Sequence, residues 1–221
     1  MEAKVVTSNK IDLDLISKCH IRAFPDSLAC ALGPKFVKVM LSWYLSSNKV
    51  FLFHLENSDG HCLGYCGGIV SDGTLGTGSD SGMAQHTFKA AIVAILTHPW
   101  VFFHKEVRNK WPIIFRNIKM KFGLSKKNHF SDQQVKIMSK EPTVGLVVIG
   151  VDPSYQVRGY GSLILKEFER VAVEDYGISK LRLSVKADNA TAIRAYEKNG
   201  WQRGEGNDGS LSMFKFIVPF K

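Results

Sequence analysis

Residues 151–161 read VDPSYQVRGYG, and this segment decides the fold. It follows Thr143–Val151, whose nearly continuous apolar residues are typical of a strand buried on both faces of a sheet. A helical pattern then runs from about Gly159 to Tyr176, with its large apolar side chains on one face, and Gly177 ends it. The segment therefore predicts a buried strand, a short loop and a long helix.

The loop of this segment is suited to binding a pyrophosphate. The first backbone N–H groups of a helix have no intrahelical acceptor, and the helix dipole is positive there. Glycine at positions 159 and 161 removes the Cβ atoms that would block a close approach, and Arg158 adds a positive charge. An ordinary strand–turn–helix that uses glycine for its turn is the alternative interpretation of the same residues.

A second segment, NATAIRAYEKNGW at residues 189–201, follows one further strand at Leu181–Val185. It predicts a helix with Asp188 or Asn189 as its cap and Gly200 as its end. Asn189, Ala192 and Tyr196 share one helical face. Such a helix can contact an extended ligand at two points.

Together the two segments resemble the paired signature of the GNAT acetyltransferase superfamily, and the match covers residues 144–201. The resemblance implies a mixed α/β (α+β) fold, in which a central, mostly antiparallel sheet is splayed at an acetyl-CoA cleft and flanked by helices. We expect a single domain over residues 1–221, with a basic helical insertion at about residues 71–142.

The resemblance also implies which residues bind acetyl-CoA, the expected cosubstrate; no metal is expected. They are Ile149, Val151, Gln156, Val157, Arg158, Gly159, Tyr160, Gly161, Ser162, Asn189, Ala192, Tyr196 and Lys198. Backbone groups of Ile149 and Val151 would pair with the pantetheine arm, and N–H groups of residues 156–162 would hold the pyrophosphate. Asn189 would bond the pantetheine, and Tyr196 would lie near the sulfur.

Direct attack of an amine on the thioester is the mechanism that the resemblance implies. A strand N–H near Val148–Ile149 is the candidate donor to the oxyanion. Tyr196 is the candidate catalytic acid for the departing thiolate, although an aromatic residue packed near a helix end is the alternative. A lysine-like amine has a pKa of about 10.4, so a base or a desolvating site is also needed. The strand before the loop contains no acid, so the candidates are Glu141, His104, His129 and a water chain, which the sequence does not rank.

The expected acceptor is a primary amine of a small molecule. AFPDSL at residues 23–28, followed by Leu32-Gly33-x-x-Phe36, resembles bacterial GNAT-like proteins whose genes accompany those for surface polysaccharides. This resemblance favours an amino sugar or a nucleotide-linked amino sugar. The alternatives are an acyl-CoA-binding sensor or scaffold without turnover, a protein or peptide N-acetyltransferase, and an unrelated nucleotide-binding module.

The remaining pattern predicts further helices and strands around this centre. The predicted helices are Ile11–Phe24 and Pro34–Ser46; the predicted strands are Lys4–Thr7, Val50–Leu55, Cys62–Val70, Trp201–Glu205 and Leu211–Val218. Tight turns are predicted to join Val50–Leu55 to Cys62–Val70 and Trp201–Glu205 to Leu211–Val218 as two hairpins.

The central part of the chain has a different composition. Ser71–Gly82 is predicted to be a flexible loop, and its glycine repeat is no P-loop because no Gly-Lys-Ser/Thr follows. Met83–Lys127 has a helical pattern, broken near Pro99 and Pro112, in which aromatic and cationic residues interleave. Three interpretations stay open: a lid over an anionic acceptor, contact with an anionic membrane surface, and a structural flap or homodimer contact.

Bulk composition limits the partners. A formal net charge of +9 favours anionic ligands, but no helix-turn-helix or zinc-finger pattern indicates nucleic-acid binding. The sequence shows neither a signal-peptide pattern nor an apolar run long enough to span a membrane, so we expect a cytoplasmic protein with free cysteines. Cys62 and Cys66 are interpreted as core thiols on one face of a strand; a metal site with His61 is the alternative.

Overall fold

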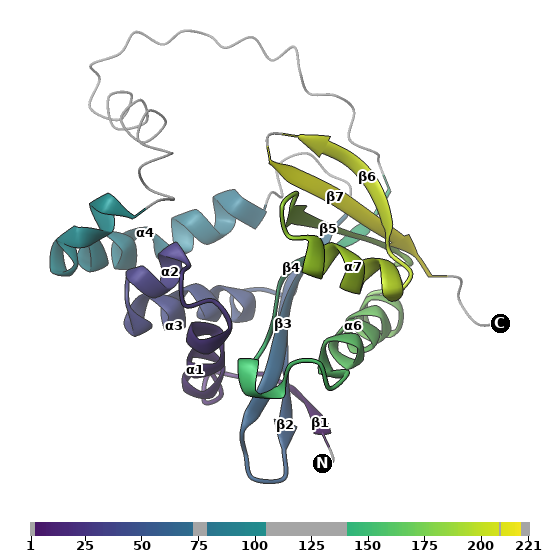
Figure 1. Cartoon of the computed structure of the whole chain (residues 1–221), viewed down its shortest axis with the longest axis horizontal. Coiled ribbons are helices and arrows are strands. Elements are labelled where there is room, and N and C mark those ends of the chain that lie inside the picture. Colours follow the sequence, from purple (N-terminus) through teal and green to yellow (C-terminus); the bar gives the residue numbers. More distant parts are fainter. Residues whose placement is uncertain (1–2, 73–78, 105–140, 208, 218–221) are drawn as a thin grey trace, which may run out of the picture.

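The computed structural model describes residues 3–72, 79–104, 141–207 and 209–217. These residues form a seven-stranded sheet with helices on both faces (Figure 1). The strands are β1 Ala3–Thr7, β2 Val50–Asn57, β3 Cys62–Ser71, β4 Thr143–Val151, β5 Lys180–Lys186, β6 Gln202–Asn207 and β7 Ser210–Phe216. Their order in the sheet is β1-β2-β3-β4-β5-β7-β6. All neighbours are antiparallel except β4 and β5, which confirms the predicted mixed, mostly antiparallel sheet.

The helices lie on the two faces of this sheet (Figure 1). They are α1 Leu13–Ala23, α2 Leu28–Ala31, α3 Pro34–Ser42, α4 Ser79–Thr97, α6 Tyr160–Arg170 and α7 Ala190–Lys198. Short 3₁₀ turns occur at η1 Trp43–Leu45, η2 Pro99–Phe103 and η3 Pro153–Tyr155, and a π-helical turn, η4 Val171–Asp175, follows α6. Among the described residues, no helix is both long and apolar enough to cross a membrane.

The parallel strands β4 and β5 pair only near their amino-terminal ends. Val144, Gly145 and Leu146 of β4 lie opposite residues 181–183 of β5, and the pairing stops there. Beyond this point β4 continues beside β3 as far as Val151, whereas β5 continues beside β7 as far as Lys186. The two strands therefore diverge toward their carboxyl ends, as the predicted splay requires.

A β-bulge lies where β4 and β5 part. Gly67 of β3 pairs with Val148 and Gly68 pairs with Leu146, so Val147 is the extra residue of β4. A bulge of this kind shifts the alternation of side chains along a strand. Leu146 packs in the core against α6, and Val148 packs in the core against α1. Val147 itself is 36% exposed, so the prediction that this strand is buried along both faces is wrong for its second half.

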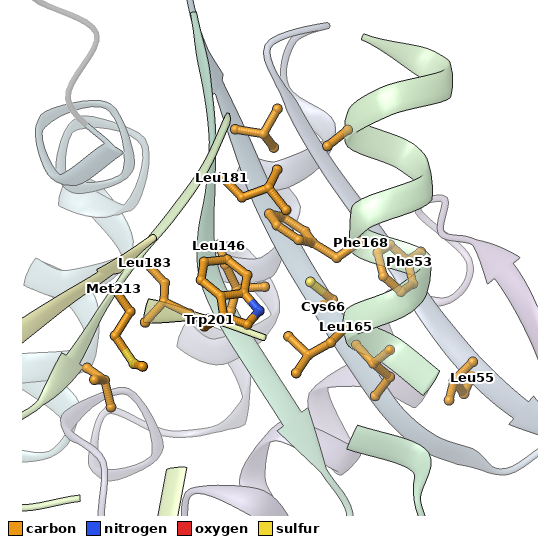
Figure 2. Close-up of a cluster of buried hydrophobic side chains, with 14 of the residues drawn as sticks. Phe53, Leu55, Cys66, Leu146, Leu165, Phe168, Leu181, Leu183, Trp201 and Met213 are labelled. Atoms are coloured by element: carbon orange, nitrogen blue, oxygen red, sulfur yellow. The ribbon is translucent and has the colours of Figure 1, made fainter. Parts of the chain in front are cut away.

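Two hydrophobic cores cover the two faces of the sheet. The core under α6 and α7 includes Phe53, Leu55, Leu146, Phe168, Leu183, Trp201 and Met213 (Figure 2). The core under α1 and α3 includes Leu13, Ile16, Cys19, Val37, Leu41, Tyr44, Leu52 and Tyr65. Because each helix buries one apolar stripe, the sheet is held between two layers of helices.

The two cysteines of β3 lie in different cores, which corrects the prediction that they share one face. Cys66 packs under α6 and Cys62 packs under α1, and both thiols are buried and free. The cause is an irregularity in the pairing of β3 with β2, where Leu55 lies opposite Gly64 but Glu56 lies opposite Cys62. This extra residue reverses the alternation of β3 between the two cysteines.

Several boundaries differ from the predicted ones. α2 was not predicted, and α6 gives way to the π-helical turn where one continuous helix to Tyr176 was expected. Residues 79–82 of the predicted loop are helical, because α4 begins at Ser79. The break near Pro99 is confirmed, since α4 ends at Thr97 and η2 begins at Pro99. Residues 73–78 and the predicted break near Pro112 lie outside the described residues.

Candidate active site

The glycine loop leaves open space above the first turn of α6. Gly159 is the amino-terminal cap of α6 and has a φ of +87°, a conformation that favours glycine. A Cβ atom added at Gly159 would meet no heavy atom within 4 Å. At Gly161 the same atom would meet only Cγ2 of Val151, at 3.9 Å. The missing side chains thus create a cradle that the protein itself does not fill.

Backbone donors converge on this cradle. The first hydrogen bond of α6 runs from the N–H of Leu163 to the oxygen of Gly159, at 3.1 Å. The N–H groups of Tyr160, Gly161 and Ser162 therefore have no intrahelical acceptor, and they lie at the positive end of the helix dipole. A pyrophosphate has the charge and the acceptor oxygens that such a site requires.

Backbone strain and a side-chain contact shape the same loop. Val157 has a φ of 61°, rare for a β-branched residue, and its side chain is fully exposed. Strained residues of this kind gather at ligand-binding sites. The guanidinium carbon of Arg158 lies 5.7 Å from the ring centre of Tyr155, and this contact holds the charge beside the loop.

Two side chains tie the loop to the rest of the fold. Asp152 is nearly buried; its carboxylate accepts the N–H of Ser154 at 3.0 Å and pairs with Nε of Arg22 on α1 at 2.5 Å. Burial raises the pKa of Asp152, but these donors outweigh burial and leave the pKa below its ordinary value. Nε2 of Gln156 donates to the oxygen of Val151 at 3.1 Å, so its side chain braces the strand end.

The helix of the second motif lies beside the first. Nδ2 of Asn199 donates to Oγ of Ser162 at 3.1 Å, which links the end of α7 to the start of α6. Asn189 caps α7, because its Oδ1 accepts the N–H of Ala192 at 3.1 Å. The cap uses the oxygen of Asn189 and leaves its exposed amide nitrogen for a ligand. Lys198 is exposed in the last turn of α7.

Tyr196 projects from α7 into the core below the cleft. Its ring centre lies 6.0 Å from that of Trp201, and the side chain is partly buried. Burial, reinforced by the nearby thiol of Cys66, raises the pKa of Tyr196 to about 12. The phenol therefore keeps its proton at neutral pH, as a hydrogen-bond donor must.

The candidate bases differ in their surroundings. Glu141 is exposed and pairs with Nζ of Lys180 at 2.6 Å, and this hydrogen bond lowers the pKa of Glu141. A carboxylate held in this way is a weak base, and it precedes the paired end of β4. Nε2 of His104 lies 3.2 Å from the backbone oxygen of Asp26. His129 lies outside the described residues.

A buried polar pair was missed by sequence reasoning. Nδ1 of His20 on α1 forms a short hydrogen bond with the hydroxyl of Tyr65 on β3, and both side chains are buried. Nε2 of His20 has no hydrogen-bond partner among the described residues. Burial lowers the pKa of His20 to about 4, so the ring is neutral. The pair lies against β4, because a Cβ at Gly150 would meet the ring of Tyr65 at 2.8 Å and that of Phe24 at 2.9 Å.

No cluster of three or more potential metal ligands occurs among the described residues. The cradle at Gly159, in contrast, suits a pyrophosphate group, because it combines open space with N–H groups that have no intrahelical acceptor. The divergence of β4 and β5 lies at the carboxyl end of the same strand that delivers this loop.

Comparisons with known proteins agree with this geometry. A model of the acetyltransferase (GNAT) family matches residues 123–201. The PaiA N-acetyltransferase of Thermoplasma acidophilum, solved in complex with coenzyme A, aligns with a TM-score of 0.53 and 12% identity over 98% of this chain and 100% of that one. No curated protein sequence matches the chain.

Other similar structures differ in the acceptors that their names state. The ribosomal-protein-S18-alanine N-acetyltransferase of Escherichia coli aligns with a TM-score of 0.51 and 18% identity, over 100% of this chain and 97% of that one. The spermidine/spermine N-acetyltransferase SpeG of Vibrio cholerae aligns with a TM-score of 0.50 and 10% identity, over 97% and 95%. These likenesses establish the fold and leave the acceptor open.

The splayed sheet and its glycine loop thus share the architecture of these similar structures. A model of the acetyltransferase (GNAT) family matches the part of the chain that contains this loop, residues 123–201, and the coenzyme A complex named above shares the fold.

Proposed function

We propose that the chain is an N-acetyltransferase that transfers the acetyl group of acetyl-CoA to a primary amine of a small molecule. The observation that carries this proposal is the open cradle at Gly159, placed at the end of β4 where β4 and β5 diverge. Acetyl-CoA supplies an acetyl group activated as a thioester. The protein must bind this donor, orient it, and manage the charges that develop during transfer.

The described geometry supports the following contacts with the donor. N–H groups from Gln156 to Ser162 hold the pyrophosphate at the start of α6. The β5-facing edge of β4 is unpaired with β5 beyond Leu146, so backbone groups of Ile149 and Val151 are placed to pair with the pantetheine arm. The amide nitrogen of Asn189 contacts the same arm, and Ala192 and Lys198 bind on the α7 side.

The chemistry requires hydrogen-bond donors at two places where negative charge develops. The oxyanion of the tetrahedral intermediate requires a fixed donor, and we assign this role to the strand N–H near Val148–Ile149, beside the bulge. We assign to the Tyr196 hydroxyl a hydrogen bond to the departing sulfur. With a pKa near 12, Tyr196 stabilises the sulfur mainly by this hydrogen bond, since complete proton transfer to a thiolate would be uphill.

The proposed acceptor is an amino sugar or a nucleotide-linked amino sugar. Its support is the segment between α1 and α2, whose sequence resembles that of proteins associated with polysaccharide genes. Phe24, the first residue of this segment, packs on His20 with ring centres 5.1 Å apart and borders Gly150 of β4. The segment therefore lies on the face of β4 opposite α6, where an acceptor has access to the thioester from the side away from the pyrophosphate.

The decisive experiment compares two glycines at opposite ends of one helical segment. Gly159 and Gly177 both have positive φ, +87° and +67°, and a Cβ at either would meet no atom within 4 Å. Alanine at either position carries a similar backbone strain of about 1–2 kcal/mol. Only Gly159→Ala should raise the KM for acetyl-CoA, by about tenfold or more, because only its Cβ enters the cradle.

The measurement is acetyl-CoA-dependent release of free thiol across a panel of amino sugars, nucleotide-linked amino sugars, polyamines and peptide amino termini. Release with an amino sugar, weakened by Gly159→Ala and not by Gly177→Ala, supports the proposal. Release only with peptides would make the chain a protein N-acetyltransferase. Binding of acetyl-CoA by calorimetry without release would favour a sensor, and absence of binding would refute the proposal.

We further propose that the chain is one domain with an insertion at about residues 71–142, and that it acts in the cytoplasm, with a homodimer as the alternative to a monomer. Ser71 at the end of β3 pairs with Thr143 at the start of β4, which supports an insertion between two adjacent strands. Gel filtration with light scattering would measure the oligomeric state.

A further inference from the structure

A cavity of about 590 Å³ lies between α3 and α4, and this volume falls within the range of ligand pockets. Its lining residues are Leu32, Gly33, Pro34, Lys35, Phe36, Val39, Lys89, Ala90, Val93, Ala94, Thr97 and His98. None of them belongs to β4, β5, α6 or α7, so the cavity is separate from the donor cleft.

The walls of this cavity are mainly apolar. Leu32 and Ala94 form a small buried cluster beneath α4, and Phe36 packs against it. Nδ1 of His98 is already hydrogen-bonded, at 2.8 Å to Thr97 and at 3.1 Å to the oxygen of Ala94. The interior therefore suits a hydrocarbon chain better than a polar ligand.

Two cations lie at the cavity, and the described residues supply no counter-charge to either. Lys35 and Lys89 are exposed, and neither has a carboxylate partner within the described part of the chain. The lining residues named above include no acidic residue. Lys38, one turn along α3, differs because its Nζ pairs with Asp14 at 2.8 Å. The cavity therefore combines an apolar interior with two ammonium groups available to an anion.

The start of α3 adds to this positive potential. The first hydrogen bond of α3 runs from the N–H of Val37 to the oxygen of Gly33, at 3.2 Å, so the N–H groups of Lys35 and Phe36 have no intrahelical acceptor. The cap residue Gly33 supplies no side-chain hydrogen bond. Like the two lysines, these N–H groups favour a negatively charged ligand.

Apolar surface continues outward from the cavity along α4 and η2. Val93, which lines the cavity, is 61% exposed, and Leu96, Trp100 and Phe103 are 77%, 60% and 85% exposed. Large side chains gathered in this way mark a binding surface more often than a solvated one.

We propose that this cavity binds an anionic amphiphile. The hydrocarbon chain occupies the space between α3 and α4, and Lys35 and Lys89 hold a phosphate or carboxylate headgroup. A free amphiphile and a membrane phospholipid share this chemistry. The proposal does not depend on the acyl-transfer activity, since it concerns other residues on other elements.

The test uses decyl phosphate below its micelle-forming concentration, titrated into the full chain by calorimetry. Lys35→Glu combined with Lys89→Glu should weaken binding by about tenfold or more, because attraction becomes repulsion. Lys38→Glu, on the same helix but outside the lining, changes the net charge as much as Lys35→Glu alone does and is the control for that single variant; it should leave affinity within about twofold. Decyl maltoside, a neutral amphiphile of equal chain length, should bind at least about tenfold more weakly.

A second pair of variants tests occupancy of the cavity. Ala90→Trp places a large ring in the cavity and should abolish binding, whereas Ala84→Trp places the same ring on an exposed position of α4 outside the lining. Thermal unfolding of both variants is measured first, to check that each of them folds. Equal decyl phosphate affinity in the two variants, or equal binding of the maltoside by the original chain, would overturn the proposal.

Flotation with vesicles distinguishes the source of the amphiphile. Binding to phosphatidylglycerol vesicles that the Lys35→Glu, Lys89→Glu variant loses assigns the cavity to membrane lipid. Decyl phosphate binding without flotation assigns it to a free amphiphile. Failure of both probes refutes the site, and it leaves thiol release from acetyl-CoA as a separate result.

Discussion

At the scale of single residues, we predict that the hydroxyl of Tyr196 contributes to catalysis. Tyr196→Phe removes one oxygen and keeps the ring that packs near Trp201. We expect kcat to fall about 100-fold with little change in the KM for acetyl-CoA, because the hydroxyl acts on the departing sulfur. Steady-state kinetics of thiol release provide the measurement.

The pH profile gives an independent check on Tyr196. Because its pKa is raised to about 12, the phenol keeps its proton through the working range of the assay. Activity lost on the alkaline side below about pH 11 must therefore have another cause. An unchanged kcat in Tyr196→Phe would mean that the hydroxyl has no catalytic role and that Tyr196 only packs as an aromatic side chain of α7.

At the scale of elements, the salt bridge between Asp152 and Arg22 joins the glycine loop to α1. Asp152→Asn should destabilise the protein by about 1–3 kcal/mol, because Asp152 is nearly buried and loses a charge-assisted hydrogen bond. The KM for acetyl-CoA should rise as well, since the loop loses its anchor. Denaturant unfolding and kinetics measure the two effects.

The control for Asp152 is another aspartate that pairs with a cation. Asp14 bridges to Lys38, but its side chain is 69% exposed. Asp14→Asn should therefore change stability by no more than about 1 kcal/mol and leave the KM unchanged. Equal effects of the two variants would mean that the loop does not depend on α1.

The elements near the donor were predictable because their information is local. Strand β4, the loop and α6 are contiguous, and the glycine at position 159 indicates in the sequence that a Cβ atom is missing from the loop. The bulge at Val147 and the separation of Cys62 from Cys66 were not predictable, because each depends on the register of a neighbouring strand. The splay of β4 from β5 came from the family resemblance, since no periodicity encodes where two distant strands part.

The pairing of His20 with Tyr65 shows the same limit for the site. The two residues are 45 positions apart and come from a helix and a strand. In the sequence each belongs to an apolar pattern, so neither signals a polar contact. Only the packing of α1 on β3 reveals it.

At the scale of the whole molecule, buried histidine makes stability depend on pH. Burial lowers the pKa of His20 from 6.5 to about 4, so between these values the unfolded chain binds a proton that the folded chain does not. Stability should therefore fall as pH drops from about 6.5 to 4, by about 3 kcal/mol from His20. Burial lowers the pKa of His54 as well, which adds to the loss in the same direction.

Urea denaturation at pH 7 and pH 4.5 measures this dependence. His20→Gln keeps a hydrogen-bonding group beside Tyr65 and removes the titration, so its stability should change less between the two pH values. Asp152 acts in a lower window: its pKa is depressed, so its contribution is lost only as pH falls below about 4. An equal pH dependence in the original chain and His20→Gln would show that His20 is not the source.

The pairing of Ser71 with Thr143 has a consequence for how this protein tolerates change. The chain leaves the sheet at Ser71 and re-enters it at Thr143, and these two residues are paired neighbours. The pairing of β3 with β4 is therefore the same as in a hairpin, whatever sequence connects the two strands. Doubling the length of such a connection costs only about 0.6 kcal/mol in loop-closure entropy. Natural variation or a deliberate graft can therefore replace α4 with another module that covers the same face of α3, while the donor cleft is left unchanged.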